Sequence, residues 1–348
     1  MNRMNHLQQT LEKNIKDNYL PHEVEFILLD YNSKDGLEEW VQQNMQQYID
    51  AGVLVYYKTY APEYYLRSHS RNMSFRLANA ELLCNLDADN FLGKRFAAFM
   101  IEEFSTHNHI FYTSNCSCND TIGRVCVRVE DFMSVRGYNE AIIGYGCEDM
   151  DFFNRLNAKG LNQMHFHDPE FYHFVCHSDR DRVSDEYMAK NVTKTYITYV
   201  NPYTSGFLLL YKDFTMEQYT LIDTHHLTTF AEFSSDGDCI WDERYGIALQ
   251  NNVLKGKWSE DNDMLCIQEN DIQYIVSKET STIQLKDRTF YEVQDTELAI
   301  KIFALLSEAI SYYETSQQMK DHSVINPDGF GKGTVYKNFD LSKKIILS

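Results

Sequence analysis

Two aspartates follow an apolar run in the segment Leu82-Leu83-Cys84-Asn85-Leu86-Asp87-Ala88-Asp89. The run predicts a strand over Leu82–Leu86, and residues i and i+2 of an extended chain point the same way. Asp87 and Asp89 can therefore direct their carboxylates to one point, where they repel each other unless a cation lies between them. Oxygen ligands suit Mg²⁺ or Mn²⁺, which complete their coordination with water and substrate phosphates. The pattern indicates a metal–diphosphate site, and a solvated turn after a strand is the simpler alternative.

A second group of carboxylates, Glu148, Asp149 and Asp151, lies at the start of a predicted helix over Glu148–Lys159. Acidic residues in a first helical turn complement the helix dipole, which would by itself account for them. The functional alternative is a general base. Backbone N–H groups hold such a carboxylate ionised while its acidic neighbours raise its pKa, so that it can accept a proton from an attacking sugar hydroxyl.

Helices and strands are predicted to alternate through the first part of the chain. Apolar spacing favours helices over Leu7–Asn18, Leu37–Asp50 and Arg71–Ala80, and strands over Val24–Asp30, Val53–Tyr57 and Leu82–Leu86. This alternation is typical of an α/β fold with a parallel sheet covered by helices, in which ligands bind at the carboxyl ends of the strands. Asp30 and Asp87 both lie at such ends.

The pattern changes in the second part of the chain. From about residue 207 to 293, short strands separated by polar turns predict an antiparallel sandwich or small barrel. A long helix over Thr296–Gln318 and a glycine-rich loop over Asn326–Gly333 follow. We therefore expect a catalytic domain at 1–204, a β-rich insertion or accessory domain at 205–294, and a long helix with a returning tail at 295–348. The β-rich part is expected to pack on the catalytic domain or to form a homo-oligomer.

Composition narrows the class of protein. The chain has 348 residues, of which 43% are hydrophobic, and a formal charge of −19, which disfavours binding to nucleic acid. We expect no transmembrane segment, because no stretch of about 18 apolar residues occurs. The eight cysteines are irregularly spaced, so reduced thiols and a cytoplasmic protein are expected. Cys116, Cys118 and Cys126 are interpreted as inert small residues in or beside strands.

Three segments together resemble the GT-A-fold glycosyltransferases: Asp87-Ala88-Asp89, Arg136-Gly137-Tyr138-Asn139-Glu140 and Gly144-Tyr145-Gly146-Cys147-Glu148-Asp149-Met150-Asp151. The resemblance extends over roughly residues 2–200. It is greatest to the β-1,4-galactosyltransferase-type C-terminal module, alongside bacterial family-2 enzymes. It implies a Rossmann-like, mostly parallel sheet flanked by helices. It also implies an inverting, metal-dependent hexosyltransferase that moves a hexose or N-acetylhexosamine from a UDP-sugar to a glycan or glycolipid hydroxyl. From the resemblance we also expect a role in polysaccharide or glycolipid biosynthesis at the inner, cytoplasmic face of the membrane.

The resemblance also implies roles for individual residues. Asp87 and Asp89 match the metal-binding acidic pair, with Asp89 as the direct ligand and Asp87 also a donor contact. Asp149 matches the catalytic base, and Glu148 matches the contact to the acceptor hydroxyl.

Three further positions match donor or metal contacts of the family. Asp30 matches a nucleoside contact, and Arg71 matches a basic residue that holds the donor. His177 matches a third metal ligand, and an imidazole ligand favours Mn²⁺ over Mg²⁺. The family has a methionine ligand three residues before this histidine, where this chain has Phe174, which cannot coordinate a metal.

The beginning of the sequence departs from the family as well. The segment Asn2-Arg3-Met4-Asn5-His6-Leu7 resembles the one that follows the family's first, uridine-binding strand. Our hypothesis is that the natural chain begins upstream, or that this is a shortened form with impaired donor binding.

Three other functions stay open. The first is a non-catalytic protein that binds a nucleotide sugar or glycan. The second is a haloacid-dehalogenase-type phosphatase, whose Asp-x-Asp is usually followed by Thr or Val rather than by Asn90-Phe91. The third is a carbohydrate-binding module in which Trp241, Tyr245 and Trp258 stack on sugar rings, although such aromatics also suit a protein core.

Overall fold

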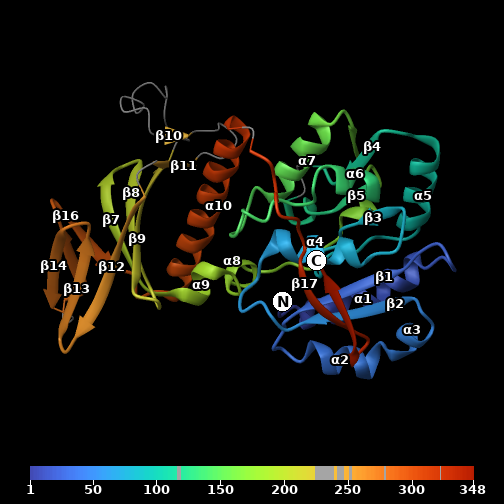
Figure 1. Ribbon diagram of the computed structural model, residues 1–348, viewed down its shortest axis with the longest axis horizontal. Coiled ribbons are helices and arrows are strands. Elements are labelled where there is room, and N and C mark those ends of the chain that lie inside the picture. Colours follow the sequence, from blue (N-terminus) through green and yellow to red (C-terminus); the bar gives the residue numbers. More distant parts are fainter. Residues whose placement is uncertain (116–118, 224–238, 241–246, 251–252, 278–279, 322) are drawn as a thin grey trace. The chain divides into compact units, whose positions relative to one another are not determined.

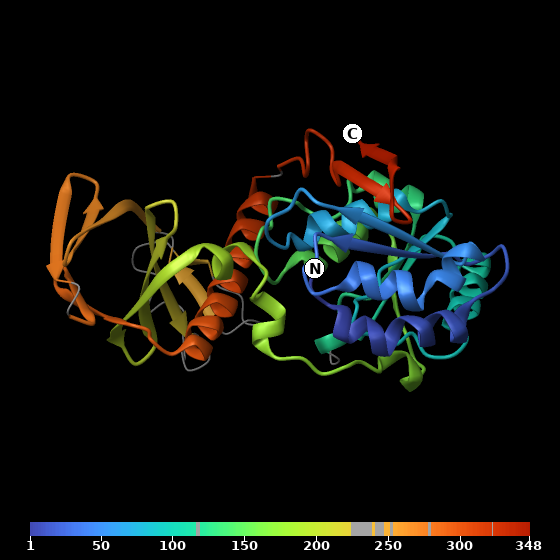
Figure 2. The ribbon, with the colours of Figure 1, turned by 90° about the horizontal axis from the view of Figure 1, so that it is seen from below.

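The computed structural model describes the chain except for residues 116–118, 224–238, 241–246, 251–252, 278–279 and 322 (Figures 1 and 2). The chain divides into two compact units. Unit 1 comprises Met1–Ile143, Cys147–Ser178 and Ser323–Ser348, and unit 2 comprises Gly144–Gly146 and Asp179–His322. The first predicted boundary, at residue 204, falls inside the sheet of unit 2, because the strands on either side of it pair as a hairpin. No described helix is long and apolar enough to cross a bilayer.

The first sheet of unit 1 has the order β1-β2-β17-β18. Its strands are β1 (Phe26–Tyr31), β2 (Leu54–Thr59), β17 (Gly333–Lys337) and β18 (Asp340–Leu347). The β1–β2 pair is parallel, whereas the two C-terminal strands are antiparallel additions, so the two ends of the sequence build one sheet. Its apolar side chains pack with those of α1 (Met4–Asn18), α2 (Leu37–Asn44) and α3 (Gln46–Asp50). The single helix expected over Leu37–Asp50 is thus interrupted, at Met45.

The second sheet of unit 1 has the order β3-β5-β4-β6. Its strands are β3 (Leu82–Cys84), β5 (Val125–Arg128), β4 (Ile110–Thr113) and β6 (Asn162–His165). The β4–β6 pair is parallel and the other two pairs are antiparallel. The α/β class is confirmed. The prediction of a mostly parallel sheet is not, because β5 runs against both of its neighbours and the C-terminal hairpin runs against β2.

Four helices and two 3₁₀ turns complete unit 1: α4 (Arg67–Leu77), α5 (Phe96–Thr106), η1 (Asn119–Thr121), α6 (Val129–Ser134), α7 (Glu148–Ala158) and η2 (Pro169–Tyr172). Aromatic side chains fasten α4 and α7 to the core. Phe75 of α4 packs edge-on against Phe132, and Phe152 of α7 stacks on Tyr138 with ring centroids 4.4 Å apart. This packing fixes the two helices whose polar ends build the site below.

The C-terminal segment returns to unit 1. Arg136 donates hydrogen bonds to the carbonyls of Ile325, Asn326 and Pro327. Asn326 donates to the carbonyls of Arg136 and Tyr138 at 2.8 Å. These bonds hold the predicted glycine-rich loop against the 136–140 segment, and from there the chain enters β17.

Unit 2 is built on a ten-stranded antiparallel sheet with the order β14-β13-β12-β9-β8-β7-β16-β15, joined by β10 and β11. These strands are β7 (Val192–Asn201), β8 (Thr204–Tyr211), β9 (Thr215–Asp223), β10 (Cys239–Ile240), β11 (Ile247–Gln250), β12 (Leu254–Asp261), β13 (Met264–Glu269), β14 (Ile272–Ser277), β15 (Thr282–Leu285) and β16 (Arg288–Glu292). The short helices α8 (Asp179–Val183) and α9 (Tyr187–Asn191) precede the sheet.

The long helix α10 (Thr296–Lys320) belongs to unit 2 and packs its apolar side on strand residues such as Leu209 and Leu221. Asp295 caps it by accepting hydrogen bonds from the backbone N–H groups of Glu297 and Leu298. Trp258 is a core residue whose indole donates to the carbonyl of Tyr211 at 2.8 Å, so it does not present its ring to a sugar. Trp241 and Tyr245 lie outside the described residues.

Candidate active site

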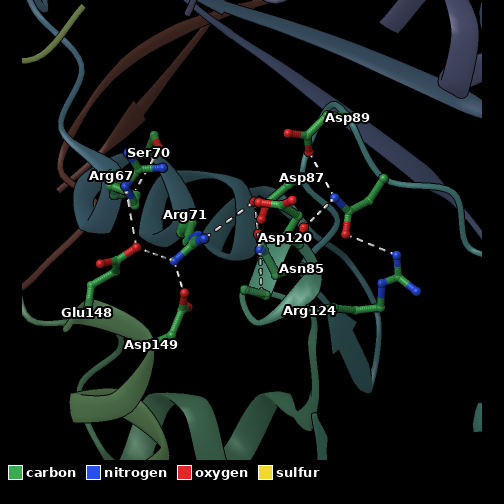
Figure 3. A network of polar contacts seen from close by, with 12 residues as sticks. Arg67, Ser70, Arg71, Asn85, Asp87, Asp89, Asp120, Arg124, Glu148 and Asp149 are labelled. Atoms are coloured by element: carbon green, nitrogen blue, oxygen red, sulfur yellow. Dashed lines mark hydrogen bonds and ion pairs between the residues drawn. The ribbon is translucent and has the colours of Figure 1, made fainter. Parts of the chain in front are cut away.

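Three separate segments of unit 1 meet at the guanidinium of Arg71. From α4, Arg71 donates a 2.7 Å hydrogen bond to Asp149 and a 3.2 Å bond to Glu148, both in the first turn of α7. Its other terminal nitrogen lies 3.4 Å from Asp87, which follows β3. Figure 3 shows the guanidinium between these two groups of carboxylates. The two acidic segments predicted from the sequence are therefore joined by one buried cation.

The approach of α7 to Arg71 depends on a backbone turn. Cys147, at the position before the helix, has φ 67°, a left-handed conformation that is uncommon for a residue with a side chain. Such conformations persist where the surrounding structure over-determines them, and they cluster at functional sites. Here the turn directs Glu148 and Asp149 toward α4, and the same first turn holds Asp151 in an ion pair with Arg155. Asp151 thus has a structural partner rather than a place in the site.

Burial controls the charge of the central groups. It raises the pKa of Asp149 to about 7, and the neighbouring charges of Glu148 and Asp87 act in the same direction against the opposing effect of Arg71. Burial also disfavours the charged form of Arg71, but Asp149 and Asp87 outweigh it and hold the pKa of Arg71 well above its ordinary value. A carboxylate with a pKa near neutrality is suited to general-base catalysis, because it can both take and release a proton at that pH.

Gly123 borders this site closely, and it was not among the residues predicted from the sequence. A Cβ atom at this position would lie 2.6 Å from the Arg71 guanidinium, 2.6 Å from the Asp87 carboxylate and 3.4 Å from that of Asp149. Asn85 connects the same elements by donating to Asp87 at 3.2 Å and to the carbonyl of Gly123 at 2.8 Å. The available signal in the sequence was a glycine two positions before the apolar strand Val125–Arg128.

Asp89 faces a different partner from Asp87. Its Oδ2 lies 2.9 Å from Nε2 of His177, so these two predicted metal ligands are in contact. A short antiparallel bridge between Asn90 and Phe174, with the N–H of Val175 donating to the carbonyl of Asp89 at 2.7 Å, brings the two segments together. Phe174, which replaces the expected methionine ligand, thus helps to position the histidine.

Asp89 and His177 suit a divalent cation. Burial opposes ionisation of Asp89, but the hydrogen bond and charge of His177 outweigh it and hold the pKa of this carboxyl below its ordinary value. An anionic oxygen and an imidazole nitrogen side by side form a mixed donor set of the kind that Mn²⁺ accepts. Among the described residues, no group of three His, Cys, Asp or Glu side chains is placed to hold a metal ion, and Asp89 with His177 is the pair in contact.

The buried side chain of Arg124 holds the loop that follows Asp89. Arg124 donates to Oδ1 of Asn90 at 3.0 Å and to the carbonyl of Phe91 at 2.9 Å, and it also bonds to the carbonyl of Phe171. Asn90 in turn donates to Asp89 at 2.8 Å. Arg124 is therefore a positioning residue that the sequence analysis did not single out.

Asp30 lies near the carboxyl end of β1, one residue before its last residue Tyr31, and its side chain is 0% exposed. It accepts hydrogen bonds from the Tyr56 hydroxyl at 2.7 Å and from the Ser33 backbone at 2.8 Å, and Lys58 lies 3.2 Å away. Its contact to a nucleoside stays a prediction, and it would require the carboxylate to exchange one of these partners.

Comparison with known proteins bears on this site. Residues 107–178 match the family model described as the N-terminal domain of galactosyltransferase. We refer to this segment, by its similarity to that family, as the galactosyltransferase-like module. It contains Gly123, Glu148, Asp149 and His177, whereas Arg71, Asp87 and Asp89 lie outside it and join it through the contacts above. The family match agrees with the resemblance inferred from the motifs.

Solved structures show a more distant likeness to the chain that carries this galactosyltransferase-like module. The catalytic domain of Drosophila β1,4-galactosyltransferase 7 in complex with xylobiose has a TM-score of 0.34 at 14% identity, covering 51% of this chain and 89% of that one. A mutant of the same enzyme with manganese, UDP-Gal and xylobiose has a TM-score of 0.29 at 15% identity, covering 49% and 85%. Significant matches among proteins with curated descriptions are absent. Because both TM-scores are below 0.5, the functional proposal rests on the galactosyltransferase-like module and on this chain's own residues.

Proposed function

We propose that this chain is a metal-dependent inverting glycosyltransferase that moves a hexose or N-acetylhexosamine from a UDP-sugar to a hydroxyl of a glycan or glycolipid. The observation that carries the proposal is the contact of Arg71 with both Asp149 and Asp87. It means that a candidate base and a candidate donor-binding carboxylate lie within reach of one side chain. The galactosyltransferase-like module supports the reaction class.

Asp89 and His177 would hold a bound Mn²⁺ or Mg²⁺ ion, with Asp87 beside them on the donor side. When bound, the cation neutralises charge that grows on the leaving diphosphate. Arg71 supplies a second positive charge for the donor, and its present bonds to Asp87 and Asp149 keep it buried and oriented before the donor arrives.

Asp149 acts as the general base. It takes the proton of the acceptor hydroxyl as that oxygen forms a bond to the anomeric carbon, while the bond from that carbon to the diphosphate breaks and UDP leaves. One displacement inverts the configuration, so an α-linked donor gives a β-linked product. Glu148, one residue earlier in the same helical turn, contacts the acceptor hydroxyl and orients it. Holding both substrates in line contributes much of the rate gain.

A screen of UDP-sugars for Mn²⁺-dependent release of UDP tests the proposal. Asp149→Asn should lower transfer by roughly 10²–10⁴-fold while UDP binding and the thermal unfolding midpoint are kept. Asp131→Asn is a matched control, because Asp131 forms an ion pair with Lys159 on the surface of the same unit. Wild-type turnover by Asp149→Asn would remove the base assignment.

Two results would instead favour the other candidate functions. Binding of UDP-sugar with no release of UDP for any donor or acceptor would indicate a non-catalytic binding protein. Release of phosphate from small phosphoesters without a sugar acceptor would indicate a phosphatase of the haloacid-dehalogenase type. Neither has a specific observation in its favour among the described contacts.

The setting of the reaction is part of the same proposal. We place the enzyme in the cytoplasm or at the inner face of the membrane, in polysaccharide or glycolipid assembly, with unit 2 as a surface for self-association. Sedimentation of the full chain with and without vesicles containing anionic lipid would test both expectations.

A further inference from the structure

Two cysteines face each other across neighbouring strands beside the proposed metal loop. Cys84 of β3 is the direct register partner of Cys126 of β5, and their sulfur atoms lie 3.0 Å apart. Both belong to unit 1. Cys126 is interpreted from the sequence as an inert small residue in or beside a strand, and its contact with Cys84, 42 positions away, is visible only in the structure.

The strand register favours a bond between them. The flanking hydrogen bonds run from the Asn85 N–H to the Val125 carbonyl and from the Val129 N–H to the Glu81 carbonyl, both at 2.9 Å. Cys84 and Cys126 therefore occupy a non-hydrogen-bonded position of the antiparallel ladder, where opposite Cα atoms approach to about 4.5 Å. That separation lies within the range that disulfides require.

The two thiols differ in access. Cys84 is exposed on β3, an edge strand of its sheet, whereas Cys126 is 2% exposed. Burial also raises the pKa of Cys126 well above its ordinary value. Cys84 is thus the thiol that a reagent in solution reaches first, and Cys126 is the one placed to resolve the product, because thiol–disulfide exchange needs an accessible attacking sulfur.

We propose that Cys84 and Cys126 form a dithiol that closes to an intrachain disulfide when it meets a small-molecule disulfide. The Cys84 thiolate attacks the reagent and releases one thiolate, which leaves a mixed disulfide on Cys84. Cys126 then attacks the Cys84 sulfur, loses its proton and releases the second half of the reagent as a thiol. Two protein thiols are oxidised to one disulfide, and one reagent disulfide is reduced to two thiols.

The position of the bond gives it a role. Cys84 lies three residues before Asp87, and Cys126 lies two residues after Arg124, which holds the loop carrying Asp89. The disulfide would link β3, from which the chain continues into the loop with Asp87 and Asp89, to β5, which directly follows Arg124. We expect the disulfide to stabilise the candidate donor site as a cross-link and to take no part in the displacement itself.

Incubation of the reduced full chain with oxidised glutathione, followed by alkylation and peptide mass spectrometry, tests this assignment. The expected product is a cross-linked peptide pair containing Cys84 and Cys126, with two fewer alkylatable thiols. The unfolding midpoint should rise by roughly 4–10 °C and return to its starting value on reduction.

Three variants make the result specific. Cys84→Ser should abolish the cross-link and the shift in midpoint, and because Cys84 is exposed, this variant should fold. Cys126→Ser should accumulate the mixed disulfide on Cys84. Cys266→Ser, in unit 2, should behave like the unmodified chain. A chain in which Cys84 carries only glutathione while Cys126 stays alkylatable, or cross-links to another cysteine, overturns the proposal.

Discussion

Arg71 donates a 2.7 Å hydrogen bond to Asp149, a residue 78 positions later in the chain. This contact joins a helix that follows the first parallel strand pair to the first turn of a helix within the galactosyltransferase-like module. Each side chain changes the ionisation of the other: Arg71 opposes the rise in the pKa of Asp149, and Asp149 raises that of Arg71. The reactivity of the proposed base is therefore set by a contact between distant segments, and the predictions below probe that contact and its surroundings.

The first prediction concerns pH. Asp149 must be ionised to accept a proton, and its pKa is raised to about 7, chiefly by burial. The active fraction therefore grows as pH rises through 7, and kcat/KM should fall by about tenfold per pH unit below it and level off above it. Initial rates between pH 5.5 and 8.5 with saturating Mn²⁺ would measure this. A flat profile over that range would contradict the assignment.

The second prediction separates the charge of Arg71 from its geometry. Arg71→Met removes the cation that lowers the pKa of Asp149. The acidic limb of the pH profile should therefore shift to higher pH by about one pH unit or more. Arg71→Lys keeps the charge but loses the fork that reaches three carboxylates. The acidic limb of the pH profile of Arg71→Lys should stay close to that of the unmodified chain, while the KM of this variant for the donor rises. Arg180→Met is a control, because Arg180 pairs with Glu297 on the surface of unit 2. Identical profiles for the Arg71→Met and Arg71→Lys variants would argue against this electrostatic role.

The third prediction uses Gly123. In Gly123→Ala, the new methyl group would meet the flexible ends of Arg71 and Asp87 at 2.6 Å, so these side chains would move rather than the backbone. We expect the unfolding midpoint to change by only a few degrees, while kcat/KM falls by roughly 100-fold, as small misplacements of reacting groups can cause. Thermal melts and UDP-release rates on the same samples would test this. Unimpaired turnover would show that the space beside Gly123 is not needed.

The fourth prediction concerns the metal. The variants Asp89→Asn and His177→Ala should each weaken Mn²⁺ binding by at least about tenfold. Mutation of a residue that only supports a metal ligand already lowers metal affinity by about that factor. Titration of Mn²⁺ alone by calorimetry or electron paramagnetic resonance measures this without turnover. His107→Ala is the matched control, because His107 is exposed at the end of α5. Equal affinity in all three variants would place the cation elsewhere.

The fifth prediction concerns the C-terminal tail. Glu140 accepts hydrogen bonds from Asn72 at 2.8 Å and from the Gly331 N–H at 2.6 Å, and Asn326 bonds to both sides of the same segment. Asn326→Ala should lower the free energy of unfolding by about 1–3 kcal/mol, because it removes a donor to the carbonyls of Arg136 and Tyr138 and the acceptor of the Glu140 N–H. Urea denaturation measures the change. Asn44→Ala, on an exposed helix end, should remain within about 0.5 kcal/mol of the unmodified chain.

Local sequence determined the elements that carry the site. The apolar run before Asp87 predicted β3, and the acidic segment at Glu148 predicted the start of α7. Periodicity and turn residues act over a few neighbouring positions, so a single sequence contains them in full. For the same reason, the long helix predicted over Thr296–Gln318 lies close to the observed bounds of α10, Thr296–Lys320.

Tertiary structure decided what those elements meet. The contact of Asp89 with His177 depends on the bridge between Asn90 and Phe174, and the space at Gly123 depends on where β5 enters its sheet. The first sheet of unit 1 is mixed because β17 returns from the far end of the chain to pair with β2, and the second is mixed because β5 runs against β3 and β4. Strand partners are chosen by packing and hydrogen bonding between distant segments, and neither leaves a periodic trace in the sequence. The residue types in the sequence therefore indicate the chemistry, whereas the fold decides which of these residues lie together in one site.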